Sequence, residues 1–562
     1  MPHATMPSPG LQALILCGPG ASLATFTSNP KESPKALLPI ANRPMVWYPM
    51  DWCHRMGIND ITLVTPAESK ANLESALATN PHLTSLPSPK AKVVAPETLT
   101  HDEATGQLLC LPEIQKAITS DFVILPCDLI SELDGTRLVQ QWMSLNPLSS
   151  TQQKGGMAVF YPTQGRDWIS HKKDETDFIS TVPLNASTVR PPHGSLRPHI
   201  ERVVNTMPTD TLNDKVEEAK GVFEQRWQLT GKYGRVKLKM KYRDAHVYIF
   251  PLWVKKFAAQ NHFESISEDV LGWWAKSQWQ NGLGEKLGLD EVLNERPHLT
   301  GNMEDSQFAD DSANATTHSP TNAPVSTQES AIGFASRVGK NANSVIRTSS
   351  VEVPPLLAYV QPLPTPTSPQ ALIRRVDTSH ALLSISLHLA KQESHQLSHE
   401  HKVHPSVILE QQARISQEDS LVAENVKIGM RSAIKSSVIG ANCEIGAYAR
   451  ITGCLLMDGV TVGDGVQLTG CIIGKRARIE GTARQESVAP ADGEKKKGKK
   501  QQGDDDNKTT LQDCEVAPHF VVEAGTDAKR EKMTAFEMVS TEDEGEGEGE
   551  GEDENEDEDM EL

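Results

Sequence analysis

The C-terminal part of the chain repeats aliphatic residues at steps of six, six and five, so the pattern returns every seventeen residues. A six-residue period fits neither an α-helix, whose period is about 3.6, nor one long strand with alternating faces. It fits coils of three short strands that stack on one another, and it therefore predicts a parallel β-helix. Glycines follow several of these residues at the expected corners, where side chains are crowded. The repeating positions are Val422, Ile428, Ile434, Ile439, Ile445, Ile451, Leu456, Val462, Leu468, Ile473 and Ile479, and the corner glycines are Gly429, Gly440, Gly446, Gly463 and Gly474.

The first half of the chain alternates short apolar runs with helical patterns. The expected strands cover residues 11–17, 60–65, 92–95, 122–125, 156–161 and 245–251, and the expected helices cover residues 44–56, 68–78 and 107–119. This alternation predicts a doubly wound, Rossmann-like α/β sheet with right-handed crossovers. Ligands of such sheets bind at the carboxyl ends of the strands, and Gly18, Gly20 and Asp128 fall at such ends.

Composition divides the chain further. The net charge is −19, and residues 542–562 carry fourteen acidic and no basic residues, so the remainder carries about −5 (−19 minus −14). Such a tail cannot bury an apolar core, and the body is not basic enough to indicate nucleic-acid binding.

Pattern and composition together divide the chain into regions. We expect an α/β domain over 1–296, a disordered insertion over 297–350, a connecting segment over 351–404, a solenoid over 405–530 with a disordered insertion at about 486–510, and a disordered acidic tail over 531–562. A shorter disordered stretch is expected over 185–215.

Cysteine usage and hydropathy indicate the compartment. The eight cysteines form no CxxC pair, which favours reduced thiols and a cytosolic protein. No apolar run approaches the roughly 20 residues of a membrane span, and no signal-peptide pattern opens the chain. Cys454, Cys471 and Cys514 share one repeat position, and we interpret them as a packed column in the solenoid rather than a zinc site.

The loop at 15–23, followed by Pro34-Lys35-Ala-Leu-Leu-Pro39, resembles the signature of sugar-nucleotide pyrophosphorylases, a Gly-x-Gly-Thr-Arg loop and then Pro-Lys-x-Leu. The resemblance implies that backbone N–H groups of this loop hold nucleotide phosphates, that Lys35 neutralises the pyrophosphate, and that Asp128 matches the magnesium-binding aspartate. Ala21 and Ser22, however, replace the threonine and the arginine.

Because that arginine is missing, we expect a degenerate site with no catalytic residue, no metal and no cofactor. Gly18, Gly20, Lys35 and Asp128 remain as vestigial nucleotide-binding candidates. In a chain that has lost the chemistry, Lys35 could instead pin a loop and Asp128 could cap the following helix.

The order of a pyrophosphorylase-like domain and a hexapeptide β-helix also resembles the gamma and epsilon subunits of eukaryotic translation initiation factor 2B, which exchanges guanine nucleotide on initiation factor 2. The strings that carry this resemblance are residues 34–49, 127–130, 244–248, 265–271, 434–440, and 454–457 with 460–462. The chain resembles the gamma subunit, in a fungal form. Nothing after the solenoid resembles the helical exchange domain of epsilon, which favours gamma over epsilon.

This resemblance implies a Rossmann-like nucleotidyltransferase domain followed by a left-handed parallel β-helix of hexapeptide repeats. It implies an epsilon-type subunit, the other subunits of the exchange complex and initiation factor 2 as partners, with no direct contact to nucleic acid or membrane. Two alternatives stay open. One is a sugar-1-phosphate nucleotidyltransferase. The other is a solenoid acyltransferase, which residues 405–485 do not favour because they contain no histidine.

Overall fold

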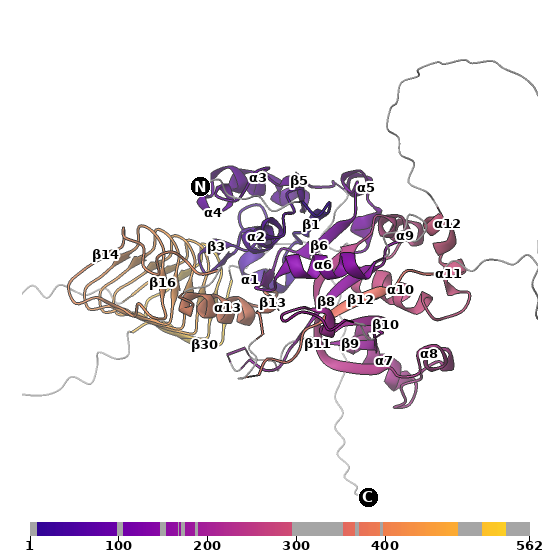
Figure 1. Ribbon diagram of the computed structural model, residues 1–562. Helices are drawn as coiled ribbons and strands as arrows, with labels where there is room; N and C mark the ends of the chain where they lie inside the picture. Colours follow the sequence, from indigo (N-terminus) through magenta and orange to yellow (C-terminus); the bar gives the residue numbers. More distant parts are fainter. Residues whose placement is uncertain are drawn as a thin grey trace, which may run out of the picture.

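The computed structural model describes an α/β body and a solenoid that lie side by side (Figure 1). The described residues are 8–97, 105–146, 153–166, 168–169, 175–185, 189–294, 352–365, 370–393, 397–481 and 508–534. The expected insertion at 297–350, most of the insertion at about 486–510 and the acidic tail from 535 onward lie outside these residues.

The α/β body is built on one nine-stranded sheet with the order β5-β4-β1-β6-β11-β8-β12-β10-β9. Its first four strands are parallel, as the alternation of strands and helices predicts for a Rossmann-like sheet. β11 then runs antiparallel to both β6 and β8, and it also pairs with β9, so the far half of the sheet closes on itself. The strands are β1 (Gln12–Leu16), β4 (Ile61–Val64), β5 (Lys92–Val94), β6 (Phe122–Pro126), β8 (Gly156–Pro162), β9 (Asp177–Pro183), β10 (Ile200–Pro208), β11 (Lys237–Phe250) and β12 (Leu356–Val360).

Helices cover both faces of this sheet because alternate residues of each strand point to opposite sides. Ala13 and Ile15 of β1 join one apolar cluster, whereas Leu14 joins the other. The first cluster includes α2 (Trp47–Arg55), α3 (Lys70–Thr79), α6 (Gly135–Leu145) and α13 (Ser379–Lys391), and the second includes α5 (Pro112–Ala117), α9 (Trp253–Asn261), α10 (Leu271–Ser277) and α12 (Leu289–Asn294).

One expected helix is split in the structure. Residues 107–119 form the short 3-10 helix η4 (Gln107–Cys110) and then α5, with an extended Leu111 between them. Pro112 causes the break, because proline lacks the backbone N–H and disfavours a helical conformation in the residue before it. Proline is nevertheless well suited to the first turn of the helix that follows.

Two segments are more ordered than we expected. The stretch at 185–215 was expected to be disordered, but β10 and α7 (Thr209–Glu218) account for its second part, so this prediction was wrong there. The segment at 351–404, expected only to connect the domains, supplies β12 to the sheet, β13 (Ile373–Arg375) beside β7 (Leu129–Ser131), and α13. β12 is a run of buried residues, as a strand between two neighbours requires.

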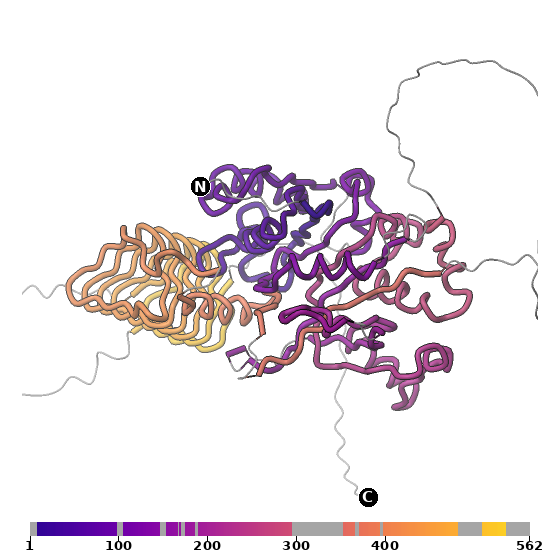
Figure 2. The backbone as a smooth tube through the Cα atoms, in the orientation of Figure 1, coloured from indigo at the N-terminus to yellow at the C-terminus, as the bar shows by residue number. Residues whose placement is uncertain are grey.

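The repeat region forms a parallel β-helix whose coils stack with the predicted seventeen-residue offset. Figure 2 shows the stacked coils as a tube. Ile428, Ile445, Val462 and Ile479 stack inside it as buried residues. After residue 481 the description resumes at 508, and Leu511 pairs with Leu468, so the chain returns to the stack in register.

Three six-stranded sheets make up the sides of the solenoid. The first contains β14 (Ile408–Leu409), β17 (Lys427–Ile428), β20 (Glu444–Ile445), β23 (Thr461–Val462), β26 (Arg478–Ile479) and β29 (Val521–Val522). The second contains β15 (Arg414–Ile415), β18 (Ala433–Lys435), β21 (Arg450–Thr452), β24 (Gln467–Thr469), β27 (Thr510–Gln512) and β30 (Asp527–Lys529). The third contains β16 (Leu421–Val422), β19 (Val438–Ile439), β22 (Leu455–Leu456), β25 (Ile472–Ile473), β28 (Glu515–Val516) and β31 (Lys532–Met533), which lies just beyond the expected boundary at 530.

The solenoid packs against the α/β body through α13, which lies between the two in Figure 1. Val438, Leu455 and Ile472 of the third sheet belong to the same apolar cluster as the first face of the α/β sheet. Polar contacts add to this packing: the Asn42 side chain donates to the Ile439 carbonyl at 2.9 Å, and the Thr25 hydroxyl donates to Glu515 at 3.0 Å.

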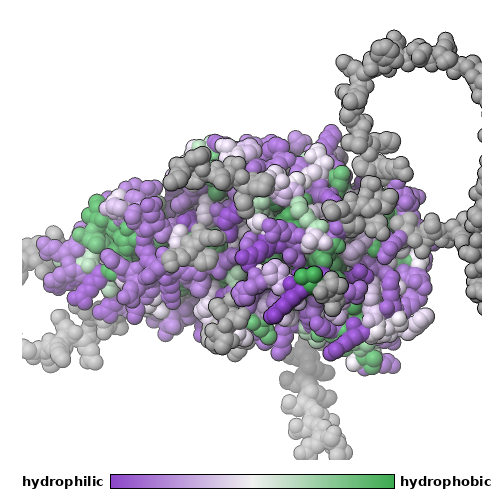
Figure 3. Space-filling view, in the orientation of Figure 1, coloured by the Kyte–Doolittle hydropathy of each residue, from purple (hydrophilic) through white to green (hydrophobic). Residues whose placement is uncertain are grey.

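Within the described residues, the first coil of the solenoid exposes aliphatic side chains. Ile408 and Leu409 of β14 are 58% and 51% exposed, and Figure 3 shows a hydrophobic patch at this end of a mostly hydrophilic face. Among the described helices, none combines the length and the hydropathy needed to cross a membrane.

Candidate functional site

The candidate site lies where β1 and β6 end. Cys17, Gly18, Pro19 and Gly20 follow β1, and Cys127 and Asp128 follow β6. Gly20 has a φ of +89°, and a Cβ there would lie 3.0 Å from Thr27 and 3.1 Å from Cβ of Lys35. The loop therefore needs glycine at this position, both for its left-handed backbone and for the close approach.

These strand ends border a cavity of about 230 Å³. Of the four predicted nucleotide-binding candidates, Gly18, Lys35 and Asp128 line it, whereas Gly20 shapes the loop without lining the cavity. Ser22 is exposed in the 3-10 helix η1 (Ala21–Leu23) and does not line the cavity either. The complete lining is Leu16, Cys17, Gly18, Pro19, Lys35, Val64, Pro66, Thr105, Leu108, Ile124, Pro126, Asp128, His246, Tyr248, Ile266 and Arg375.

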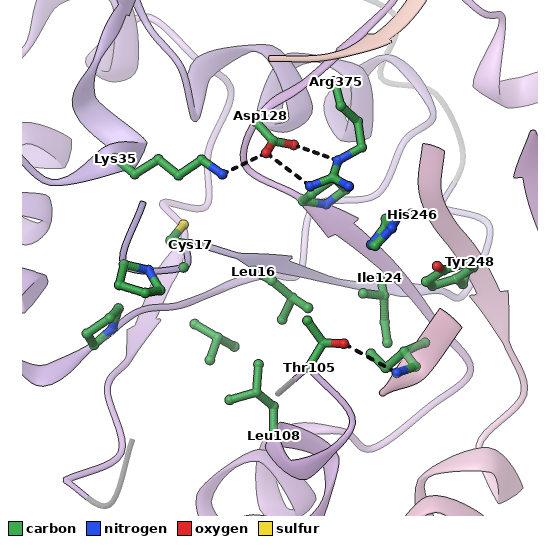
Figure 4. Close-up of a pocket in the computed structure, with 16 residues that line it drawn as sticks. Leu16, Cys17, Lys35, Thr105, Leu108, Ile124, Asp128, His246, Tyr248 and Arg375 are labelled. Carbon is green, nitrogen blue, oxygen red and sulfur yellow. Dashed lines mark hydrogen bonds and ion pairs between the residues drawn. The ribbon is translucent and has the colours of Figure 1, made fainter. Parts of the chain in front are cut away.

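Asp128 is the centre of the polar part of the cavity (Figure 4). Its carboxylate, 1% exposed, lies 2.7 Å from Nζ of Lys35 and accepts hydrogen bonds from Nε and a terminal nitrogen of Arg375 at 3.2 and 3.3 Å. Burial favours the neutral acid, but the Arg375 and Lys35 charges outweigh it and hold the pKa of Asp128 well below its usual value. Asp128 is therefore an ionised carboxylate between two cations.

Arg375 was not among the predicted site residues. It reaches the cavity because β13 pairs with β7 in a register that sets Arg375 opposite Leu129, the residue after Asp128. The hydrogen bond that results joins Arg375 to Asp128, which is 247 positions away in the sequence. No local motif marks such a contact, so the sequence offered no signal for it.

The arrangement leaves Asp128 little capacity for a metal ion. A magnesium ion would have to displace both cations from the carboxylate, and Mg²⁺ prefers oxygen ligands in near-octahedral geometry. The described residues hold no cluster of three or more His, Cys, Asp or Glu side chains suited to a metal. Asp128 does not cap a helix: β7 follows it, and Asp134 caps α6 by accepting from the Arg137 amide at 3.3 Å.

The wall opposite Asp128 comes from a bulge in β11, where the pairing with β8 shifts between Asp244 and Tyr248. His246 takes a φ of +52° in this bulge and lines the cavity. Burial, followed by the Arg375 charge, holds the pKa of His246 well below its usual value, so its ring is neutral.

Tyr248 donates a 2.6 Å hydrogen bond to Asp244, which is 3% exposed. Burial, followed by the charge of Asp177, raises the pKa of Asp244 to about 7. In the sequence, residues 244–248 stand out only as one of the strings that carry the family resemblance. Its role in the cavity depends on a bulge that sequence patterns do not reveal.

Comparison with known proteins shows similarity to two family models and to a curated relative. A family model described as "Nucleotidyl transferase" matches residues 13–157, and one described as "EIF2B subunit epsilon LbH domain" matches residues 398–489. A protein of Schizosaccharomyces pombe (strain 972 / ATCC 24843) named "Translation initiation factor eIF2B subunit gamma" is 26% identical over 285 residues, which is 50% of this chain and 55% of the relative. The matched region thus spans about half the length of that relative.

These matches confirm the predicted fold class, a nucleotidyltransferase domain followed by a left-handed β-helix. They also confirm the resemblance to subunits of initiation factor 2B, since the solenoid model is named for epsilon and the relative for gamma.

Proposed function

We propose that this chain is a gamma-type, non-catalytic subunit of a complex that exchanges guanine nucleotide on initiation factor 2. The observation that carries the proposal is the joining of a nucleotidyltransferase domain to a left-handed β-helix in a chain whose relative is named as subunit gamma of that factor. In this role the chain supplies rigidity and contact area beside an epsilon-type subunit, which performs the exchange. We place the complex in the cytosol.

The proposed mechanism is indirect. A complex that binds the nucleotide-free form of initiation factor 2 more tightly than the nucleotide-bound form shifts the equilibrium toward release. A subunit that only holds the complex together needs no chemistry of its own, but it must present a fixed surface. The apolar cluster shared by α13, the third solenoid sheet and the α/β sheet supports such rigidity.

Nucleotidyl transfer by this chain is not favoured. The loop arginine that would stabilise the leaving pyrophosphate is replaced by Ser22, and losing one such electrostatic stabiliser costs about 2.7–4 kcal/mol of transition-state stabilisation. Asp128, in the position of the metal-binding aspartate, is already paired with Lys35 and Arg375. Both features support a degenerate site.

The cavity could still hold a nucleotide as a regulator, with Gly18 and Lys35 at the phosphates and Gly20 shaping the loop. A phosphate would compete with Asp128 for Lys35 and Arg375, so we expect weak binding. The test is the melting temperature of the purified chain with nucleotides or sugar nucleotides at millimolar concentration. If no compound raises it, the cavity is not a nucleotide site.

A pull-down from the native cytosol at moderate salt tests the proposed complex. We expect an epsilon-type subunit and initiation factor 2 to be recovered with the chain. Recovery of the chain without these proteins would contradict the proposal. It would favour the alternative function, a sugar-1-phosphate nucleotidyltransferase. That alternative predicts pyrophosphate release that Lys35→Ala abolishes, whereas our proposal predicts none from the wild-type chain.

A further inference from the structure

The two strand ends at the cavity each carry a cysteine. β1 and β6 are parallel neighbours with Leu16 opposite Pro126, so the next residues in register are Cys17 and Cys127. Neighbouring strands lie roughly 4.7–4.9 Å apart. That spacing falls within the range of about 4.4–6.8 Å between Cα atoms that a disulfide can bridge.

The two side chains also meet. Both belong to the same apolar cluster, and the thiols lie close enough to share a hydrogen bond. Cys17 lines the cavity, and Figure 4 shows its sulfur on the side where Lys35 reaches Asp128. A small reagent that enters the cavity therefore reaches one member of an adjacent dithiol.

Position gives the two thiols different roles. Cys17 lines the cavity, whereas Cys127 does not line it and is 1% exposed. A peroxide in the cavity therefore meets Cys17 first, and Cys127 is the resolving thiol. The Cys127 thiol and burial raise the pKa of Cys17 well above its usual value, so we expect its oxidation to be slow.

We propose that Cys17 and Cys127 form a redox-sensitive dithiol that closes to a disulfide when a hydroperoxide enters the cavity. The Cys17 sulfur attacks one peroxide oxygen and the O–O bond breaks, which leaves Cys17 as a sulfenic acid. The released hydroxide takes the proton that Cys17 gave up. The Cys127 sulfur then attacks the Cys17 sulfur, the S–O bond breaks, and the hydroxyl leaves as water with the Cys127 proton.

For hydrogen peroxide the balance is two thiols oxidised to one disulfide and one peroxide reduced to two waters. The bridge joins the residue before Gly18 to the residue before Asp128, so it fixes the glycine loop to the strand that carries the buried carboxylate. A thiol reductant such as dithiothreitol restores the open form.

The solenoid provides a matched control pair. Leu455 pairs with Ile472 on parallel strands, which sets Cys454 and Cys471 in the same relation as Cys17 and Cys127. The Cys471 amide donates to Cys454 Sγ at 3.4 Å, and both side chains are 0% exposed. Neither of these two cysteines lines the cavity. They have the spacing of Cys17 and Cys127 but not the access to peroxide, so we expect no disulfide between them.

The test treats the full chain with hydrogen peroxide, alkylates the remaining thiols and identifies disulfide-linked peptides by mass spectrometry. We expect a linked peptide that contains Cys17 and Cys127, disappears with dithiothreitol and has no Cys454–Cys471 counterpart. Oxidation of Met143, which is 39% exposed, shows in the same sample that the oxidant reached the protein.

Two variants separate the roles. Cys127→Ser should abolish the bridge and leave a Cys17 sulfenic acid that dimedone traps, and Cys17→Ser should leave Cys127 reduced. The proposal is overturned if Met143 oxidises while the Cys17–Cys127 peptide never appears, or if the solenoid pair bridges equally fast. Wild-type protein whose Cys17 stops at the sulfenic or sulfinic acid would overturn it as well.

Discussion

At the scale of single residues, the site depends on one buried carboxylate and two cations. Lys35 and Asp128 could be predicted because each sits in a recognisable string at a strand end. Arg375 could not, because its position depends on the pairing of β13 with β7 across a long stretch of chain. Local strings reveal which residues sit at strand ends, but only the tertiary fold reveals which charges meet there.

Replacing Asp128 with asparagine should destabilise the α/β body strongly. Lys35 and Arg375, whose side chains are 11% and 16% exposed, would lose their anionic partner, and breaking a buried ion pair typically costs about 3–5 kcal/mol. Urea denaturation followed by tryptophan fluorescence measures the loss, because all nine tryptophans precede the solenoid.

The control for Asp128→Asn is Lys92→Gln, which breaks a solvent-exposed pair with Asp60 in the same α/β body, where the two atoms are 2.9 Å apart. Solvent-exposed ion pairs contribute little to the free energy of unfolding, so this variant should unfold at the same urea concentration as the wild type. Equal effects of the two substitutions would show that Asp128 is not buried between cations as described.

Asp244 should make the stability of the α/β body fall as pH rises. Burial, then Asp177, raises the pKa of Asp244 to about 7 from an ordinary value of 3.8, so between these values the folded chain holds a proton that the unfolded chain has lost. The stabilisation is complete below the unfolded value and is lost as pH rises through the folded value. Within this window one bound proton changes the free energy of unfolding by about 1.4 kcal/mol per pH unit.

Asp244→Asn should remove this contribution, and the difference between the two proteins isolates it from every other titrating group. Urea denaturation at several pH values between 4 and 8 measures the difference. Parallel stability curves for wild type and variant would mean that Asp244 titrates normally.

At the scale of elements, the hexapeptide rule predicted the solenoid coil by coil, because each inward position is specified by a single repeat. Corner glycines such as Gly446 are required for a steric reason: a Cβ there would lie 2.7 Å from the Asp464 backbone nitrogen. At a different corner, the backbone is in the left-handed region in several coils. Three different residue types occupy this corner: Ser436, Gly453 and Arg530.

Less of the α/β body could be predicted. A proline inside an apparent helical pattern divided the helix at 107–119. β10 and β12 were missed because polar and low-complexity stretches border them in the sequence. A strand that pairs with distant parts of the chain, such as β12, has a weaker sequence pattern than a solenoid strand, whose pattern recurs in every coil.

Two glycine substitutions should therefore differ. Gly446→Ala should destabilise the solenoid by about 1–3 kcal/mol, the usual cost of overpacking, because backbone atoms of Gly463 and Asp464, as well as the Asp464 side chain, lie too close to the new methyl group. Gly453→Asn, at a φ of +66° with nothing closer than 3.8 Å, should cost less, since asparagine tolerates left-handed backbone. Hydrogen exchange read by mass spectrometry reports on the coils directly, and equal protection in the two variants would contradict the steric explanation.

At the scale of the whole molecule, the α/β body and the solenoid share an apolar cluster, so they present their outer surfaces in a fixed relation. Among the described strands, β14 ends its sheet and pairs only with β17, and it exposes two aliphatic side chains. Unpaired strand edges with apolar side chains favour association with another chain. If the chain is the proposed subunit, β14 in the first coil of the solenoid is thus the surface we expect an epsilon-type partner to contact.

Ile408→Glu combined with Leu409→Glu should reduce recovery of the epsilon-type partner in a pull-down at least about tenfold, because charges would have to be buried at the contact. Val521→Glu is the matched control: Val521 is 49% exposed on β29, at the other end of the same sheet. If both variants retain the partner equally, the contact lies elsewhere.

The most direct test of the proposed function is the rate at which labelled GDP leaves initiation factor 2. We expect that this chain alone leaves the rate unchanged, that an epsilon-type subunit raises it, and that the two together raise it further. Acceleration by this chain alone, or no gain when it joins the epsilon-type subunit, would contradict a non-catalytic subunit of the exchange complex.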